Sequence, residues 1–182
     1  MCIIDNKRPA VFLDRDGVLT VEKGYVTAKK DMEIFSYVAE CIKQIHLKGY
    51  YAIVVTNQSG VARGLFTEEI LREMNNELID RTGVDAVFYC PHHPEGKIKQ
   101  YRCLCHCRKP ETGMFEMACK QFNIDIEKSY MVGDRAGDIV VGKNLGVKTV
   151  LVDSGYGVLG LEQNVKPDYI LDDLRNVINI LE

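Results

Sequence analysis

AVFLDRDG, residues 10–17, is the stretch that decides the fold. Its first half is a short apolar run that ends abruptly at the acidic residues Asp14 and Asp16. A run of this length, closed by polar and turn-prone residues, is typical of a strand buried in a parallel sheet. Similar runs predict further strands over residues 50–55, 86–89, 130–132 and 147–152, with a weaker candidate over residues 169–171.

Helical periodicity separates these strands. Apolar residues spaced three and four apart predict helices over residues 38–45, 70–78 (after a Thr67 N-cap), 114–122, 138–145 and 173–181. Strands that alternate with helices along the whole chain predict a doubly wound α/β fold with a parallel sheet and right-handed crossovers.

We expect a single domain over residues 1–182, because neither a repeat nor a linker divides the sequence. The one irregular stretch runs from Cys90 to Pro110. Residues 60–89 are needed for a core helix and a core strand, which leaves no room for a large cap domain.

The composition is that of an ordinary globular domain, with 182 residues of which 46% are hydrophobic and 27% are charged. The formal net charge of -3 excludes a global cationic field that would hold nucleic acid or an anionic membrane. The N-terminus lacks a signal-peptide pattern, and no apolar segment approaches the roughly 20 residues of a spanning helix. We therefore expect a soluble, cytoplasmic, monomeric protein with no nucleic-acid or membrane partner.

The seven cysteines are unevenly placed, since four of them crowd into residues 90–107. An odd number of cysteines without an export signal argues against a disulfide framework and favours metal binding by the cluster. The scattered Cys2, Cys41 and Cys119 are expected to be inert, the last two as small thiols on apolar helix faces.

Polar motifs follow the predicted strands, where ligands bind in such sheets. The first strand leads into Asp14 and Asp16, the second into TNQSG (residues 56–60), and the fourth into GDRAGD (residues 133–138), while Lys109 precedes the third helix. Two carboxylates leaning to one side of an extended chain need a cation, and an all-oxygen site suits Mg²⁺. With neutral donors from TNQSG and the charge of Lys109, these are the parts of a phosphoryl-transfer site.

Each motif alone has a simpler explanation. DxDG is most often a turn, TNQSG is an ordinary polar turn, and acids at a helix N-terminus complement the helix dipole. A calcium-binding EF-hand loop is excluded because Val18 occupies its third ligand position and Leu19 the position of its required glycine. The occurrence of all four motifs, in order, at strand and helix ends favours phosphoryl transfer.

These four motifs together resemble the haloacid dehalogenase-like (HAD) phosphatase superfamily over nearly the whole chain. The resemblance implies that Asp14 is the nucleophile that becomes an aspartyl-phosphate. Asp16 would be the general acid and then the general base, which requires a raised pKa. Thr56 and Lys109 would hold the transferring phosphoryl group.

The same resemblance implies the ligands of the Mg²⁺ ion. Asp134 would bind it together with the Asp14 carboxylate and the backbone carbonyl of Asp16. Asp138 would lie behind these ligands, without binding the ion directly.

The irregular stretch holds seven possible soft metal ligands in eighteen residues, within CPHHP (residues 90–94) and CLCHC (residues 103–107). Four of them suffice for a closed tetrahedral Zn²⁺ site, and a loop this long needs such a staple. The alternatives are a reduced thiol cluster in a mobile loop and a catalytic zinc, although four protein ligands leave a catalytic zinc no open position.

The cysteine loop also resembles the zinc-loop branch of the superfamily, which contains heptose-bisphosphate phosphatases and histidinol-phosphate phosphatases. By that resemblance, the zinc-binding loop spans residues 90–107 and the ligands are Cys90, His92, Cys105 and Cys107. Histidinol-phosphate phosphatases have a shorter stretch than the twelve residues between His92 and Cys105 here, so the loop length favours the heptose family.

The loop carries five basic residues against one acid between residues 90 and 110. This charge is either a solvated surface or a recognition site in which Arg108 binds a second phosphate or sugar hydroxyls. EKGY, residues 22–25, resembles the substrate segment of the heptose family. The substrate-binding residues expected from the loop, this segment and the TNQSG turn are Arg108, Glu22, Lys23, Gly24, Tyr25, Asn57, Gln58 and Ser59.

The sequence therefore predicts an Mg²⁺-dependent phosphatase that removes the C7 phosphate of D-glycero-D-manno-heptose 1,7-bisphosphate through an aspartyl-phosphate. One alternative is a histidinol-phosphate phosphatase. Another is a zinc-dependent nucleic-acid-binding module on an inactive phosphatase scaffold, against which the net charge of -3 argues.

Overall fold

The computed structural model describes residues 7–182, so the expectation for Cys2 lies outside the described residues. Six parallel strands form one sheet in the order β3-β2-β1-β4-β5-β6. The strands are β1 (Arg8–Leu13), β2 (Tyr51–Asn57), β3 (Ala86–Cys90), β4 (Ile124–Gly133), β5 (Lys148–Val152) and β6 (Tyr169–Leu171).

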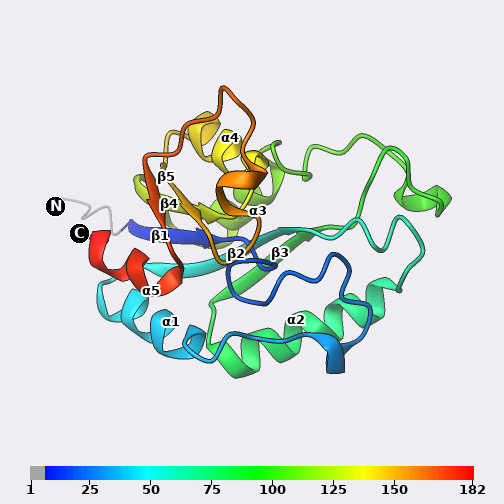
Figure 1. Ribbon diagram of the computed structural model, residues 1–182, viewed down its shortest axis with the longest axis horizontal. Coiled ribbons are helices and arrows are strands. Elements are labelled where there is room, and N and C mark those ends of the chain that lie inside the picture. The colour runs from blue at the N-terminus through cyan, green and yellow to red at the C-terminus, as the bar shows by residue number, and fades with distance from the viewer. Residues whose placement is uncertain (1–6) are drawn as a thin grey trace, which may run out of the picture.

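Helices cover both faces of the sheet (Figure 1). One face is covered by α3 and α4, and the other by α1, α2 and α5. The helices are α1 (Val38–Leu47), α2 (Glu68–Thr82), α3 (Gly113–Gln121), α4 (Ala136–Leu145) and α5 (Leu174–Val177), with short 3₁₀ turns at Lys29–Asp31, Lys99–Tyr101, Gly157–Gly160 and Ile178–Ile180. The predicted doubly wound fold is confirmed.

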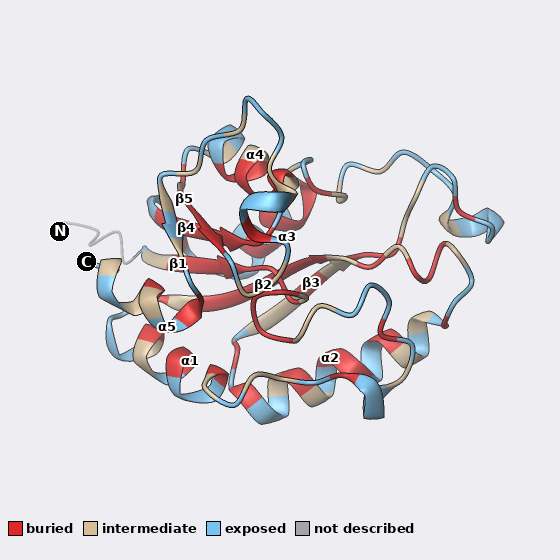
Figure 2. Cartoon of the chain, viewed as in Figure 1, coloured by how far each residue is buried: buried red, intermediate tan, exposed pale blue. Residues whose placement is uncertain are grey.

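The residues of β1 alternate between two hydrophobic cores because successive side chains of a strand point to opposite faces. Phe12 packs edge-on against Phe115 of α3, with ring centroids 4.9 Å apart. Val11 and Leu13 belong to the core beneath α1, α2 and α5. The strands β1, β2 and β5 and the second half of β4 are accordingly mostly buried (Figure 2), which explains why they read as unbroken apolar runs.

The strand order reverses between β1 and β4, which are neighbours in the sheet although they are far apart in sequence. This switch point is where doubly wound sheets bind ligands, beyond the carboxyl ends of the strands. Asp14 follows β1 there, and Asp134 follows β4.

Three predicted elements differ from the structure. The second strand continues through Thr56 and Asn57, which were expected in a turn. β4 begins at Ile124 rather than residue 130, because Ser129 fills an irregularity in its pairing with β1 by accepting a hydrogen bond from Ala10 N at 2.9 Å. The helix predicted over residues 173–181 is only α5 followed by a 3₁₀ turn.

The expected burial of Cys119 on an apolar helix face is wrong, because this thiol is exposed on α3. The buried positions of α3 include Phe115 and Ala118, so the next residue along the helix faces solvent. Cys41 is buried on α1 as expected. Among residues 7–182, no helix is both long enough and apolar enough to cross a membrane.

Candidate active site and metal centres

A cavity of about 280 Å³ opens at the carboxyl ends of β1 and β2, beside the start of α4. Its walls bring together residues that are distant in sequence. Those predicted from the sequence are Asp14, Asp16, Glu22, Gly24, Tyr25, Thr56, Asn57, Gln58, Ser59, Arg108, Lys109 and Asp138.

Two of the predicted residues do not line this cavity. Lys23 lies outside it and forms an ion pair with Glu33 at 2.9 Å. Asp134 is fully buried beneath it.

Asp14 is held by the end of β1 and by a buried cation. Its backbone N–H donates to Val132 O of β4 at 2.9 Å, which extends the strand pairing by one residue. Its Oδ1 accepts from Arg15 N at 2.8 Å and from Lys109 Nζ at 3.1 Å, leaving Oδ2 without either contact. Burial raises the pKa of Asp14 to about 6, with Asp138 adding to the effect and Lys109 opposing it.

Lys109 is buried and has an acceptor for each of its three ammonium protons. These are Asp138 Oδ1 at 2.6 Å, Val55 O at 2.7 Å and Asp14 Oδ1 at 3.1 Å. Burial works to lower the pKa of Lys109, but the carboxylates of Asp138 and Asp14 outweigh it and raise the pKa. The ammonium group therefore stays charged at neutral pH.

Asn57 contacts the backbone of Lys109. Its Nδ2 donates to Lys109 O and its Oδ1 accepts from Lys109 N, both at 3.0 Å. Both ends of the amide are engaged, so Asn57 fixes the backbone of Lys109, and its Nδ2 keeps one further proton.

Asp16 accepts hydrogen bonds on both carboxylate oxygens. Arg15 donates to both, Thr20 Oγ1 donates to Oδ1 at 3.0 Å, and Gln58 Nε2 donates to Oδ2 at 2.7 Å. Burial raises the pKa of Asp16, but the Arg15 guanidinium and these hydrogen bonds outweigh it and lower the pKa. The expected raised pKa is therefore wrong for this arrangement.

Gln58 also links Asp16 to Thr56, since its Nε2 donates to Thr56 Oγ1 at 3.0 Å. The amide nitrogen of Gln58 is thus committed to two neighbours. The Thr56 hydroxyl accepts from Gln58 and keeps its own proton for a ligand in the cavity.

Three buried carboxylates fit a divalent cation. Asp14, Asp134 and Asp138 each offer an oxygen, and these atoms lie within 4.8 Å of one another. Asp134 Oδ2 accepts from Tyr156 N at 2.9 Å, whereas Asp134 Oδ1 is buried without a hydrogen-bond partner. Arg135 Nε lies 3.8 Å from this oxygen, too far for a hydrogen bond, and a buried oxygen of this kind beside two further carboxylates suits Mg²⁺.

The backbone around this acidic group has no space for additional atoms. Gly17 has a φ of +83°, and a Cβ there would lie 2.3 Å from Asp134 Oδ2. Asp138 accepts from Lys109 on one oxygen and from Arg135 N at 3.2 Å on the other. These contacts support the predicted role of Asp138 behind the metal ligands, where it holds Lys109.

Burial and the charge of Asp14 raise the pKa of Asp134 to about 7. The folded protein therefore binds this proton more tightly than the unfolded chain does, and stability falls as pH rises between the two pKa values. Without metal, Asp134→Asn should be more stable than the wild type at pH 8, by on the order of 2–4 kcal/mol, and the difference should shrink towards pH 5.

The free energy of unfolding of both proteins, measured with and without Mg²⁺, tests this prediction. Mg²⁺ should stabilise the wild type at pH 8 and leave Asp134→Asn unchanged. The exposed Asp172→Asn is the control and should behave as the wild type. Equal stabilisation of wild type and Asp134→Asn by Mg²⁺ would contradict the assignment.

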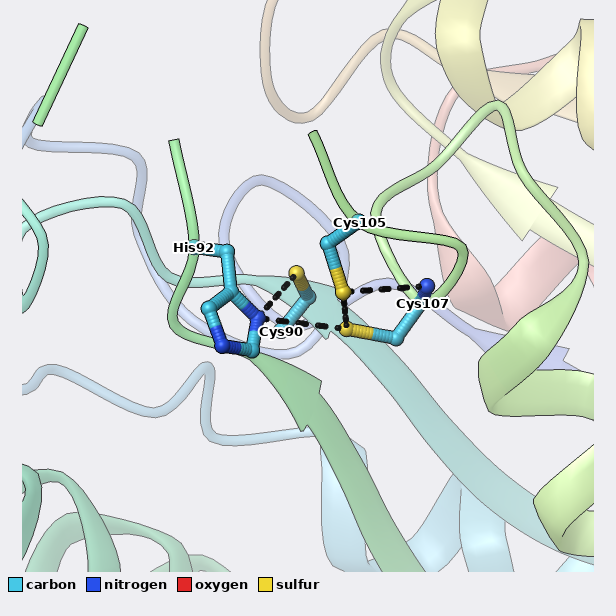
Figure 3. A group of neighbouring side chains, drawn as sticks. All are labelled: Cys90, His92, Cys105 and Cys107. Atoms are coloured by element: carbon cyan, nitrogen blue, oxygen red, sulfur yellow. Dashed lines mark hydrogen bonds between the residues drawn. The ribbon is translucent and has the colours of Figure 1, made fainter. Parts of the chain in front are cut away.

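A second cluster lies where the cysteine loop leaves β3 (Figure 3). Ligand atoms of Cys90, His92, Cys105 and Cys107 lie within 4.8 Å of one another. His92 Nδ1 is 3.7 Å from Cys90 Sγ and 3.6 Å from Cys107 Sγ. A tetrahedral Zn²⁺ with bonds of about 2.3 Å to sulfur and about 2.0 Å to nitrogen separates such atoms by roughly 3.5 Å.

The cluster thus fits zinc, although the two sulfur atoms of Cys105 and Cys107, 2.8 Å apart, would have to separate. Their thiols resist ionisation without a cation. The pKa of the Cys107 thiol is raised mainly by a hydrogen bond with Cys90 and also by burial. Burial raises the pKa of the Cys105 thiol. Four protein ligands leave no open position, so this site is structural in kind.

The remaining soft residues of the loop lie outside this cluster. Cys103 is exposed. His93 accepts from Glu95 N at 3.1 Å and contacts Arg63, while His106 contacts Glu116 at 2.8 Å.

Zinc content tests the ligand set. Purified wild type should hold about one Zn²⁺ per chain, and Cys105→Ser should lose it together with thermal stability. Cys103→Ser is the matched control in the same loop and should retain zinc. Loss of zinc from Cys103→Ser with retention by Cys105→Ser would reassign the ligands.

Sequence reasoning missed Arg135 and Tyr156, which line the cavity, and Arg63, which contacts the cysteine loop. The Arg135 guanidinium lies 3.9 Å from the centroid of the Tyr156 ring and pairs with Glu22 at 3.0 Å. Arg63 contacts His93 at 3.2 Å, and its Nε is buried without a hydrogen-bond partner. Arg135 lies inside the GDRAGD motif, but no local pattern marks Arg63 or Tyr156.

The fold and the site together define the class of protein, that of the HAD-like hydrolases. Residues 106–177 match the HAD-hydrolase-like family model. The chain is 42% identical over 178 residues to D-glycero-beta-D-manno-heptose-1,7-bisphosphate 7-phosphatase of Haemophilus ducreyi, covering 94% of this chain and 97% of that protein. The enzyme of the same name from Escherichia coli K12 is 42% identical over 176 residues, covering 93% of this chain and 91% of that protein. This chain belongs to the D-glycero-beta-D-manno-heptose-1,7-bisphosphate 7-phosphatase family.

Solved structures show the same similarity. The D,D-heptose 1,7-bisphosphate phosphatase of B. bronchiseptica, complexed with magnesium and phosphate, matches with a TM-score of 0.79 and 29% identity, covering 94% of this chain and 96% of that one. The enzyme of the same name from Burkholderia thailandensis matches with a TM-score of 0.66 and 25% identity, covering 94% and 97%.

Proposed function

We propose that this protein removes the C7 phosphate of D-glycero-β-D-manno-heptose 1,7-bisphosphate through an aspartyl-phosphate on Asp14. The main support for this proposal is the position of Asp14 at the cavity. The buried Lys109 holds the Asp14 carboxylate, which forms one acidic group with Asp134 and Asp138. The names of the relatives support the substrate and its β anomer.

In the first half of the reaction, Asp14 Oδ2 attacks phosphorus as the bond from phosphorus to the sugar oxygen breaks. Lys109 and the Thr56 hydroxyl stabilise charge on the phosphoryl oxygens. Asp16 gives a proton to the leaving oxygen. A phosphate dianion beside Asp16 would raise its pKa, since a like charge disfavours ionisation.

In the second half, the Asp16 carboxylate takes a proton from water, which attacks phosphorus and breaks the bond to Asp14. Inorganic phosphate leaves, and Asp16 is protonated again for the next cycle. Bound to Asp14, Asp134 and the Asp16 backbone carbonyl, Mg²⁺ would offset the negative charge of the carboxylates and the phosphoryl group.

Arg108 supports a substrate with a second phosphate. It lines the cavity and donates to His92 O at 3.4 Å, and burial and the nearby charge of Arg63 lower its pKa. Within residues 7–182, neither arginine has an ion pair with a carboxylate. A guanidinium at the cavity without a carboxylate partner favours a second anion over the cationic amine of histidinol phosphate.

We also propose that residues 1–182 form one domain, in which the zinc-binding loop of residues 90–107 positions Arg108 and Lys109, the residues directly after it, at the substrate site. Glu22, Gly24, Tyr25 and Ser59 line the same cavity and would contact the sugar. The net charge of -3 argues against a nucleic-acid partner, and we propose that the enzyme acts in the cytoplasm as a monomer.

Phosphate release tests the reaction and its substrate. With Mg²⁺, the β heptose bisphosphate should be hydrolysed faster than the α anomer or histidinol phosphate. Asp14→Asn should lose at least about 10³-fold in kcat, because an amide cannot attack phosphorus. The exposed Asp172→Asn should keep wild-type activity.

A hydroxylamine-sensitive phosphoenzyme should be trapped in the wild type. Retention of a tenth of the activity by Asp14→Asn, or failure to trap the phosphoenzyme, would contradict the covalent mechanism. A preference for histidinol phosphate would contradict the substrate.

Arg108→Ala tests how the second phosphate is recognised. It should lower kcat/KM for the heptose bisphosphate about tenfold to a hundredfold, because a charge-assisted pair is lost, and it should spare a small phosphate monoester. The exposed Arg102→Ala of the same loop is the control and should change neither value. Equal losses on both substrates would place Arg108 in the common phosphoryl step.

A further inference from the structure

Arg15 lies between the two aspartates of the first motif and has no role in the reaction described above. Its guanidinium donates to both oxygens of Asp16, from Nε to Oδ1 at 3.1 Å and from Nη2 to Oδ2 at 2.9 Å. A planar fork that grips both oxygens restricts rotation of the carboxylate, which a single-point ammonium contact does not.

The two partners differ in their access to the cavity. Both residues border the cavity, but the Asp16 side chain is 21% exposed, whereas the Arg15 side chain is only 1% exposed. The guanidinium therefore lies behind the carboxylate, out of reach of a substrate.

The backbone of Arg15 is also fixed. Its carbonyl accepts from Leu19 N at 2.9 Å and from Thr20 N at 3.0 Å, within the tight turn that Gly17 permits with its positive φ. The fork thus projects from an anchored turn.

A polar residue on the buried face of α2 completes the arrangement. Asn75 is 4% exposed beside the buried Met74 and Leu78, and its Oδ1 accepts from Arg15 Nη1 at 3.4 Å. Its Nδ2 is buried without a hydrogen-bond partner. An apolar side chain would avoid this cost, so the contact with Arg15 is the feature that distinguishes Asn75 from its core neighbours.

We propose that Arg15, anchored by Asn75, is the positioning residue that holds the Asp16 carboxylate towards the leaving group and the attacking water. The inference rests on the proposed function, in which Asp16 transfers the proton. Proton transfer depends on the placement of the acid, so a carboxylate held by Thr20 and Gln58 alone, without the planar fork, loses part of a contribution of about 10²- to 10⁴-fold.

Two substrates with different leaving groups separate positioning from a general structural role. The sugar oxygen of the heptose bisphosphate needs a proton as it leaves, whereas the nitrophenolate of p-nitrophenyl phosphate leaves without one. Arg15→Met should lower kcat/KM for the heptose bisphosphate about tenfold to a hundredfold and that for p-nitrophenyl phosphate by no more than about threefold. Arg15→Lys should show the same selective loss, because it keeps the charge and loses the fork.

Asn75→Ala provides a milder variant, since it removes an unsatisfied donor and keeps Arg15. It should shift the same substrate ratio about threefold in the same direction, as expected for loss of one weak neutral contact. Asn76→Ala, at the exposed neighbouring position of α2, is the matched control and should leave the ratio unchanged.

Asp16→Asn distinguishes failure of this inference from failure of the proposed function. If Asp16→Asn loses activity selectively on the heptose bisphosphate while the Arg15 and Asn75 variants lose both substrates equally, or neither, the positioning role is overturned alone. If Asp16→Asn itself loses both equally in kcat/KM, Asp16 is not the acid of the first step, and both proposals fall. Should Arg15→Met not fold, the ratios of Arg15→Lys and Asn75→Ala decide the outcome.

Discussion

A single ammonium group among three buried carboxylates is the constraint on which the site depends. Lys109 contacts Asp14 and Asp138, and these two lie with Asp134 in one acidic group. When all three carboxylates are ionised, they and the one ammonium leave a charge of -2 among largely buried side chains. A divalent cation neutralises that charge, and a phosphate brings further anionic oxygens to the cation and the lysine.

The sheet supplies this arrangement at its switch point. Adjacent strands β1 and β4 end in Asp14 and Asp134, and β2 lies on the other side of β1 with Thr56. The reacting groups therefore sit on strand ends whose side chains are packed between two cores. Buried and paired, they are held in one geometry before any substrate arrives.

The outer part of the cavity is built differently. Tyr25 and Arg108 reach it from segments with little regular structure, one following β1 and the other following β3. The second segment has a cluster of three thiols and an imidazole at its base, a donor set for zinc, whereas the reacting centre offers only oxygens. Donor chemistry thus separates a structural metal from a catalytic one within a single chain.

Much of the molecule followed from pattern alone. Unbroken apolar runs such as residues 10–13 are buried on both faces, so their strand character and the doubly wound class were readable, and the motifs around Asp14, Lys109 and Asp134 placed the reacting groups at strand ends. The limits of β4 were not readable, because a polar stretch pairs with Arg8 and Pro9 of β1 beyond an irregularity at which Ser129 accepts from Ala10 N.

Tertiary structure alone decided which polar groups face the cavity. Asn57 and Gln58 read as turn donors, but their amides are committed to Lys109, Asp16 and Thr56, contacts that no local spacing predicts. The pKa of Asp16 likewise depends on how the Arg15 guanidinium folds back onto it. Sequence motifs identify which groups can react, whereas their partners and charge states follow from contacts between segments that only the folded chain brings together.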